Sequence, residues 1–228
     1  MMAPRVLALD PGLSNFGWCI ADVSGSLPKI LAAGVFSTDK ATKKQQAMVA
    51  DDNQRRIAEL TRHVWKLLSP KYGVRGVIAE AMSFIRHPGG ISVVGSVQLM
   101  TSIAVYTSLA TVRDLPITIL SPKDVKAGVG ADISTLPKPE KFPKGYTPTK
   151  DEKRAQNKAK EERKEASKRL VQARILTILK PQRATIMKFA EALGDEDKWE
   201  HMFDSIGVIV AGMNSMMVRT LRQGMVRK

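Results

Sequence analysis

The chain has 228 residues and a strong excess of positive charge, with 36 lysines and arginines against 22 aspartates and glutamates, a net charge of +14 and a pI of about 10.0. Such an excess favours a polyanionic partner, first nucleic acid and second an anionic membrane surface. Hydrophobic residues make up 43% of the chain, which is enough to bury a core and excludes disorder throughout.

The sequence disfavours a membrane-spanning or secreted protein. No stretch approaches the roughly 20 continuous apolar residues of a spanning helix, and no amphipathic anchor or secretory signal is evident. The single cysteine, Cys19, excludes an internal disulfide framework and a zinc site made of thiolates. We therefore expect a cytoplasmic protein.

The N-terminal part of the chain has the pattern of three strands, at residues 5–10, 16–23 and 30–37. Each is an apolar run bounded by turn residues, among them a Pro-Gly pair after the first run and Gly25 after the second. Short turns join antiparallel neighbours, so these strands form an antiparallel meander.

Helices and strands alternate after the meander. A helical pattern at 41–68 precedes a strand at 74–80, and a second helical pattern at 97–112 precedes a short strand at 116–120. Strands that follow crossover helices run parallel to the strand they join. The fold class is therefore α/β, with a mixed five-stranded sheet of an antiparallel meander and parallel strands, flanked by helices.

The C-terminal half contains a basic Pro-, Gly- and Lys-rich insertion at 128–162, within what we expect to be a single domain of residues 1–228. Its four prolines disfavour regular structure before Lys150. A long charged helix is predicted at 150–180, with an apolar stripe only near its end. A short helical segment and a final helix from about 199–221 close the chain.

Four polar residues form a candidate metal site. Asp10 and Glu80 each end a predicted strand, and the carboxyl ends of such strands meet at one edge of an α/β sheet. Two ionised carboxylates repel at short distance unless a cation lies between them, and oxygen ligands favour Mg²⁺, with Mn²⁺ as a substitute. His201 and Asp204 share one face of the last helix, three residues apart. The set predicts two-metal hydrolysis of a phosphodiester.

Simpler interpretations apply to each of these residues taken alone. Asp10 before Pro-Gly is also a common turn former, and Glu80 is compatible with a solvated strand end. His201 is compatible with a packing residue, or with a pair to Asp197 four residues earlier. The charged run at 150–174 is compatible with a solvated helix face or with a DNA contact.

The motifs resemble those of RuvC-type Holliday junction resolvases of the ribonuclease H-like superfamily. The strand-Asp-Pro-Gly opening, the strand-Glu and the final helix with two polar residues three apart occur in the same order as in that family. The segment SPKDVKAGVG resembles the family's Pro-x-x-Val-Lys motif and contains Lys126, and ASKRLVQARIL resembles a helix that carries a second functional lysine, here Lys168. The resemblance covers nearly the whole chain and is compatible with a phage-like member.

The resemblance implies a Mg²⁺-dependent endonuclease that acts as a homodimer on four-way or other branched DNA, in a bacterial cell or the cytosol of a phage-infected host. The implied metal ligands are Asp10, Glu80, His201 and Asp204. Lys126 and Lys168 would contact the scissile phosphates and stabilise the charge of the transition state. No small-molecule cofactor is implied.

Further nucleic-acid contacts are expected beside this site. The resemblance places an aromatic side chain that enters the junction close to Phe84, although the match is approximate. The other expected contacts are basic residues in the glycine-rich loop after Glu80 and beside the two lysines, namely Arg86, His87, Lys123, Lys164 and Arg169.

Other function classes compete with this interpretation. A sugar kinase or an actin-like ATPase also opens with an acidic hairpin, but it needs a second homologous half that this chain lacks. A non-catalytic nucleic-acid-binding protein gains nothing from carboxylates that repel phosphate. An RNA-processing nuclease of the same superfamily stays open, because the sequence does not separate RNA from DNA.

Overall fold

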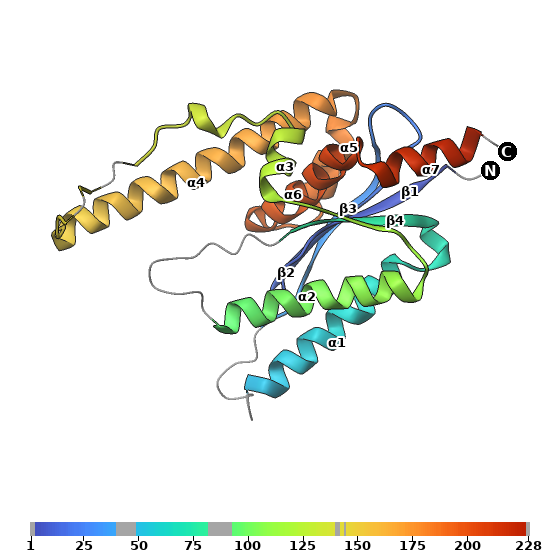
Figure 1. The fold of residues 1–228 in the computed structure, drawn as a ribbon, viewed down its shortest axis with the longest axis horizontal. Coiled ribbons are helices and arrows are strands. Elements are labelled where there is room, and N and C mark those ends of the chain that lie inside the picture. The colour runs from blue at the N-terminus through green and yellow to red at the C-terminus, as the bar shows by residue number, and fades with distance from the viewer. Residues whose placement is uncertain (1–2, 40–48, 82–92, 140–141, 144, 227–228) are drawn as a thin grey trace.

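The computed structural model of the chain describes most of its length, namely residues 3–39, 49–81, 93–139, 142–143 and 145–226. Figure 1 shows a central sheet with helices on both of its faces. Among the described residues, none of the helices is both long and apolar enough to cross a membrane.

The sheet has five strands in the order β3-β2-β1-β4-β5. Strands β1 (Arg5–Asp10), β2 (Asn15–Asp22) and β3 (Lys29–Ser37) form the antiparallel meander, and β4 (Val74–Glu80) and β5 (Ile117–Leu120) are parallel to β1. The predicted fold class and strand directions are confirmed, and the ends of each strand lie within one residue of the predicted ones.

Helices cover both faces of the sheet. Helices α1 (Val49–Leu67) and α2 (Val93–Val112) lie on one face, and α6 (Glu196–Gly212) packs on the other (Figure 1). A separate cluster of buried apolar residues fills the space on each side. Because both faces are covered, β1 is a continuous apolar run rather than an alternating one.

Three further helices pack on the α6 side. Helix α3 (Pro122–Gly128) begins with a capping box, α4 (Lys150–Ile178) is the longest helix described, and α5 (Arg183–Glu191) follows it. Helix α4 also begins with a capping box, in which Thr149 and Glu152 bind each other's backbone N–H groups. This cap explains why the helix begins directly after the proline-rich stretch.

The predicted insertion at 128–162 comprises two kinds of structure. Residues 150–162 belong to α4, as the sequence predicts. The described residues between Gly128 and Thr149 are irregular apart from a short 3₁₀ turn at Ile133–Thr135. Figure 1 shows this segment running alongside α4, whose first half projects beyond the sheet.

The prediction of one final helix at 199–221 is wrong, because the chain forms two. Helix α6 ends at Gly212, and α7 (Met216–Val226) begins after a short turn. The hydroxyl of Ser215 accepts a hydrogen bond from the N–H of Val218 at 3.3 Å, so it caps a new helix. Apolar periodicity continues across the turn, which is why the pattern alone does not show the break.

Helix α6 approaches β2 very closely at Gly17. A Cβ atom at this position would overlap the backbone carbonyl of His201 and would lie 3.2 Å from the Cβ of Asp10. Only glycine allows this contact, since any side chain would push α6 away from the sheet. The close approach brings the polar residues of α6 beside the end of β1.

We expect Gly17→Ala to lower the free energy of unfolding by about 1–3 kcal/mol, because overpacking forces α6 and β2 apart. The control is Gly25→Ala, whose added Cβ would meet only the carbonyl oxygen of Leu27 at an ordinary 3.4 Å. Urea unfolding of both variants checks the prediction, and equal losses would contradict it.

Candidate active site

Strand periodicity directs the two strand-end carboxylates to the same face of the sheet. In β1 and β4, Ala8 and Ile78 belong to the apolar cluster beneath α6. Side chains alternate along a strand, so Asp10 and Glu80, two residues further on, point to this same side. Leu9 of β1 pairs with Ala79 of β4, so the residues that follow them, Asp10 and Glu80, lie side by side at one edge of the sheet.

A hydrogen bond from α6 reaches the first of these carboxylates. The Nδ1 atom of His201 lies 2.8 Å from Oδ2 of Asp10, and this hydrogen bond raises the pKa of His201, against the opposing effect of burial. The partner of His201 is therefore Asp10 rather than Asp197. Asp204 faces the same edge, one helical turn further along α6.

The loop after Asp10 is held by a buried guanidinium group. Arg56, on α1, is 1% exposed and donates hydrogen bonds to the hydroxyls of Thr38 at 2.9 Å and Ser14 at 2.7 Å. Thr38 in turn donates to the carbonyl oxygen of Leu13 at 2.5 Å. This network fixes the turn that presents Asp10.

The carboxylates oppose one another's ionisation. Burial, and then the charge of Asp10, raises the pKa of Glu80 to about 7, while Lys126 acts in the opposite direction. Burial and the charges of Asp10 and Glu80 raise the pKa of Asp204 well above its ordinary value. The edge of the sheet therefore carries an excess of negative charge that a cation would offset.

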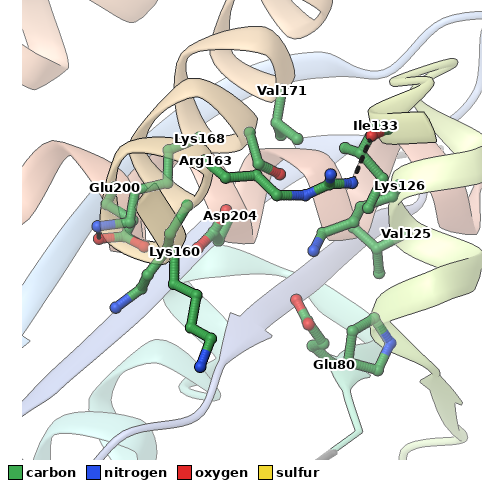
Figure 2. Close-up of a pocket in the computed structure, with 13 residues that line it drawn as sticks. Glu80, Val125, Lys126, Ile133, Lys160, Arg163, Lys168, Val171, Glu200 and Asp204 are labelled. Atoms are coloured by element: carbon green, nitrogen blue, oxygen red, sulfur yellow. Dashed lines mark hydrogen bonds and ion pairs between the residues drawn. The ribbon is translucent and has the colours of Figure 1, made fainter. Parts of the chain in front are cut away.

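A cleft of about 410 Å³ opens beside these carboxylates (Figure 2). Glu80 comes from the sheet and Asp204 from α6, whereas basic side chains of α3 and α4 form its walls. Acidic and basic groups are thus placed within one hollow. Its basic lining residues are Lys126, Lys160, Arg163, Lys164 and Lys168.

Glu200 is a cleft residue that the sequence pattern did not indicate. Its carboxylate lies 2.7 Å from Nζ of Lys168, which also lies 2.7 Å from Glu165. Partial burial lowers the pKa of Lys168, but the hydrogen bonds to these two carboxylates raise it more, so the net shift is upward. The sequence signal for Glu200 is its position four residues before Asp204, which places both carboxylates on the same face of α6.

The remaining predicted contacts are divided among three locations. Lys123 lines a neighbouring hollow of about 560 Å³ that also includes Lys126. Lys164 lines the cleft, whereas Arg169 is exposed on another side of α4. Three predicted residues lie outside the described part of the chain, namely Phe84, Arg86 and His87.

The donor atoms of the site fit a metal ion in chemical type. Among the described residues, no three His, Cys, Asp or Glu side chains lie close enough together to form a metal-binding group. The chemistry of Asp10, Glu80 and Asp204 nevertheless fits a hard divalent cation, because oxygen donors suit Mg²⁺, and because burial and mutual repulsion raise the pKa of Glu80 and of Asp204. The residues therefore fit in chemical type and in charge.

Solved structures share this arrangement of the chain. RuvC of T. thermophilus in complex with a Holliday junction substrate is 13% identical, with a TM-score of 0.55 over 97% of this chain and 96% of that one. The yeast mitochondrial Holliday junction resolvase Ydc2 is also 13% identical, with a TM-score of 0.55 over 100% and 88%. No protein-family model matches the chain, and no curated protein matches it by sequence.

These likenesses show the fold. The sheet order, the mixed strand directions and the helices on both faces define a ribonuclease H-like fold. Within that class, the fold of the chain is similar over nearly its whole length to that of T. thermophilus RuvC.

The raised pKa of Glu80 predicts how stability changes with pH. In the unfolded chain this carboxyl ionises near its ordinary pKa of 4.5, but in the folded protein it does so at about 7. The folded state holds more protons between these values, so the free energy of unfolding falls as pH rises from about 4.5 to about 7. Glu80→Gln should flatten this decline, as measured by urea unfolding without divalent cations.

The control for this measurement is Glu152→Gln. The hydrogen bond from the backbone N–H of Thr149 lowers the pKa of the Glu152 carboxyl. Replacing Glu152 therefore cannot flatten the decline in the free energy of unfolding between about pH 4.5 and 7. A Glu80→Gln profile parallel to that of the unchanged protein would contradict the assignment.

Proposed function

We propose that this protein is a Mg²⁺-dependent, structure-specific endonuclease that cleaves phosphodiester bonds in four-way junctions or other branched DNA. The observation that carries the proposal is the placement of Asp10, Glu80 and Asp204 at one edge of a RuvC-like sheet, where their charges interact, beside a cleft with basic walls. A protein that only bound nucleic acid would gain nothing from carboxylates that repel phosphate.

The proposed metal ligands are Asp10, Glu80 and Asp204, with His201 as a fourth. Bound there, divalent ions would supply the activation of water and the stabilisation of the leaving oxygen. The hydrogen bond between His201 and Asp10 orients both side chains before substrate arrives. Orientation of this kind lowers the cost of assembling the site.

The basic walls would bind the DNA backbone. Lys126, on α3, lies close enough to oppose part of the rise that burial and Asp10 cause in the pKa of Glu80, so a phosphate bound by this lysine would lie beside the carboxylates. Lys168 approaches from α4, already held in place by Glu165 and Glu200. Both ammonium groups would stabilise charge that develops on the phosphate oxygens. DNA would replace one carboxylate partner of Lys168.

We also propose that the protein acts as a homodimer, which places two sites on the two strands to be cut. Helix α2 has no charged residue along its 20 positions, and Met100 and Val112 are 52% and 70% exposed. An uncharged surface helix with exposed apolar side chains is typical of a protein interface.

The junction bound to T. thermophilus RuvC supports branched DNA as the substrate class.

We expect cleavage of labelled four-way and three-way junctions in Mg²⁺, slower cleavage of linear duplexes, and a loss of at least about 100-fold in Asp10→Asn. Binding by the variant should be equal or tighter, because a charge that repels phosphate is removed. The control is Asp151→Asn on the exposed face of α4.

Each part of the proposal has an outcome that contradicts it. Equal cutting of linear and branched DNA would reject structure specificity, and unimpaired cutting by Asp10→Asn would reject the site. A junction with RNA arms, cut faster than DNA, would favour the RNA-processing nuclease. Binding without any cleavage would favour a non-catalytic protein.

Mg²⁺ binding has a readout that does not depend on activity. At pH 8, where Glu80 is ionised, added Mg²⁺ should raise the unfolding temperature, because an ion that binds only the folded state stabilises it. Asp204→Asn should reduce this shift at constant ionic strength, and Asp151→Asn should retain it. Equal shifts in all three proteins would reject a metal site at Asp204.

A further inference from the structure

The first half of α4 and the segment beside it form one projecting unit. The guanidinium of Arg163 donates hydrogen bonds to the carbonyl oxygens of Ile133, Leu136 and Pro137, all at 2.8 to 2.9 Å. Figure 1 shows that this part of α4 extends beyond the sheet. We call residues 133–137 and 150–168 together the arm.

Cations of the arm form a stripe that leads out of the cleft. Lys160, Lys164 and Lys168 line the cleft from α4, and Lys153 lies two turns before Lys160, on the same face of the helix. We call these four residues the cationic stripe. Figure 2 shows the Lys160 and Lys168 side chains extending from α4 on the side of the cleft opposite Lys126.

Acidic residues are segregated on the other faces of the arm. Helical spacing places Asp151 and Glu162 on the face turned away from the cleft, and Glu161 and Glu165 on a flank beside it. Arg154 lies 3.6 Å from Asp151 and Lys158 lies 3.9 Å from Glu162, whereas Glu165 pairs with Lys168 at the inner end of the stripe.

Within the described arm, Lys168 is paired with two carboxylates, but the other three lysines of the stripe are not. In the parts of the arm that the structure describes, no ion pair involves Lys153, Lys160 or Lys164, and Lys160 donates to the amide oxygen of Gln156 at 2.8 Å. A solvated helix normally mixes both signs of charge on each face. Here the face toward the cleft is basic, so it suits a polyanion.

We propose that the cationic stripe binds the backbone of one duplex arm of the branched DNA as that arm leaves the cleft. The inference rests on the proposed function, because the stripe begins at the candidate active site. Lys168 lies 15 positions after Lys153, which is about 22 Å along the helix. Phosphates follow each other every 3.4 Å or so along the axis, so the stripe spans about six of them.

The first test compares two double variants with the same change in net charge. Lys153→Gln with Lys160→Gln removes the outer stripe, and Arg154→Gln with Lys158→Gln removes two cations that lie outside the stripe and pair with acidic residues. Binding of a four-way junction is measured over a salt series without divalent cations, so that no cleavage occurs. Circular dichroism checks that α4 remains helical.

The stripe variant should bind about tenfold more weakly at moderate salt, and its slope of log K against log salt should fall by about 1.8, or 0.9 per lost contact. The second double variant should change both quantities much less, because Arg154 and Lys158 lie outside the stripe and are already paired with Asp151 and Glu162. Equal effects of the two variants would overturn the proposal, since only net charge would then matter.

A photo-crosslinker provides the second test. Cys19 is fully buried, so a cysteine introduced by Lys153→Cys is the reactive thiol, and Arg154→Cys is the control one residue away. The crosslinker on residue 153 should attach to DNA about six nucleotides from the branch point. Equal or absent attachment at both positions would overturn the proposal.

These measurements separate the inference from the proposed function. If stripe-dependent binding is found but no cleavage occurs with Mg²⁺, the inference holds and the nuclease proposal fails. If cleavage occurs and both double variants bind alike, the nuclease proposal holds and the inference fails.

Discussion

The hydrogen bond between His201 and Asp10 joins side chains 191 positions apart in the sequence, and the candidate active site depends on it. The contact forms because α6 crosses β2 at Gly17, where the absence of a side chain lets the helix backbone approach the sheet. The same approach sets the position of Asp204 on α6. A fold that separated this helix from the sheet would keep every polar residue and lose the site.

Charge at this site is balanced over a short distance. The sheet edge gathers carboxylates, and their burial and mutual repulsion raise the pKa of Glu80 and of Asp204, while α3 and α4 supply cations to the same cleft. Lys126 partly offsets the negative charge, and Lys168 is occupied by Glu165 and Glu200. The folded state therefore accepts electrostatic cost at the place where a charged substrate would bind, which is common at functional sites.

Much of the fold follows from local patterns. The strand patterns predict that Asp10 and Glu80 lie at one edge of the sheet, and helical spacing predicts that His201 and Asp204 share one face of a helix. The turn at Ser215 does not show in the sequence pattern, because apolar spacing continues through it. The pairing of Lys168 with Glu200 depends on how α4 and α6 pack together, which no local pattern contains.

Arg163 attaches the arm in a way that lets the sequence of residues 133–137 vary during evolution. Its three partners are backbone carbonyl oxygens of residues 133, 136 and 137, which every amino acid supplies. Side chains at these positions are therefore free to change while the attachment is kept. Mutation can then alter the surface that the arm presents without loosening the arm from the body of the protein.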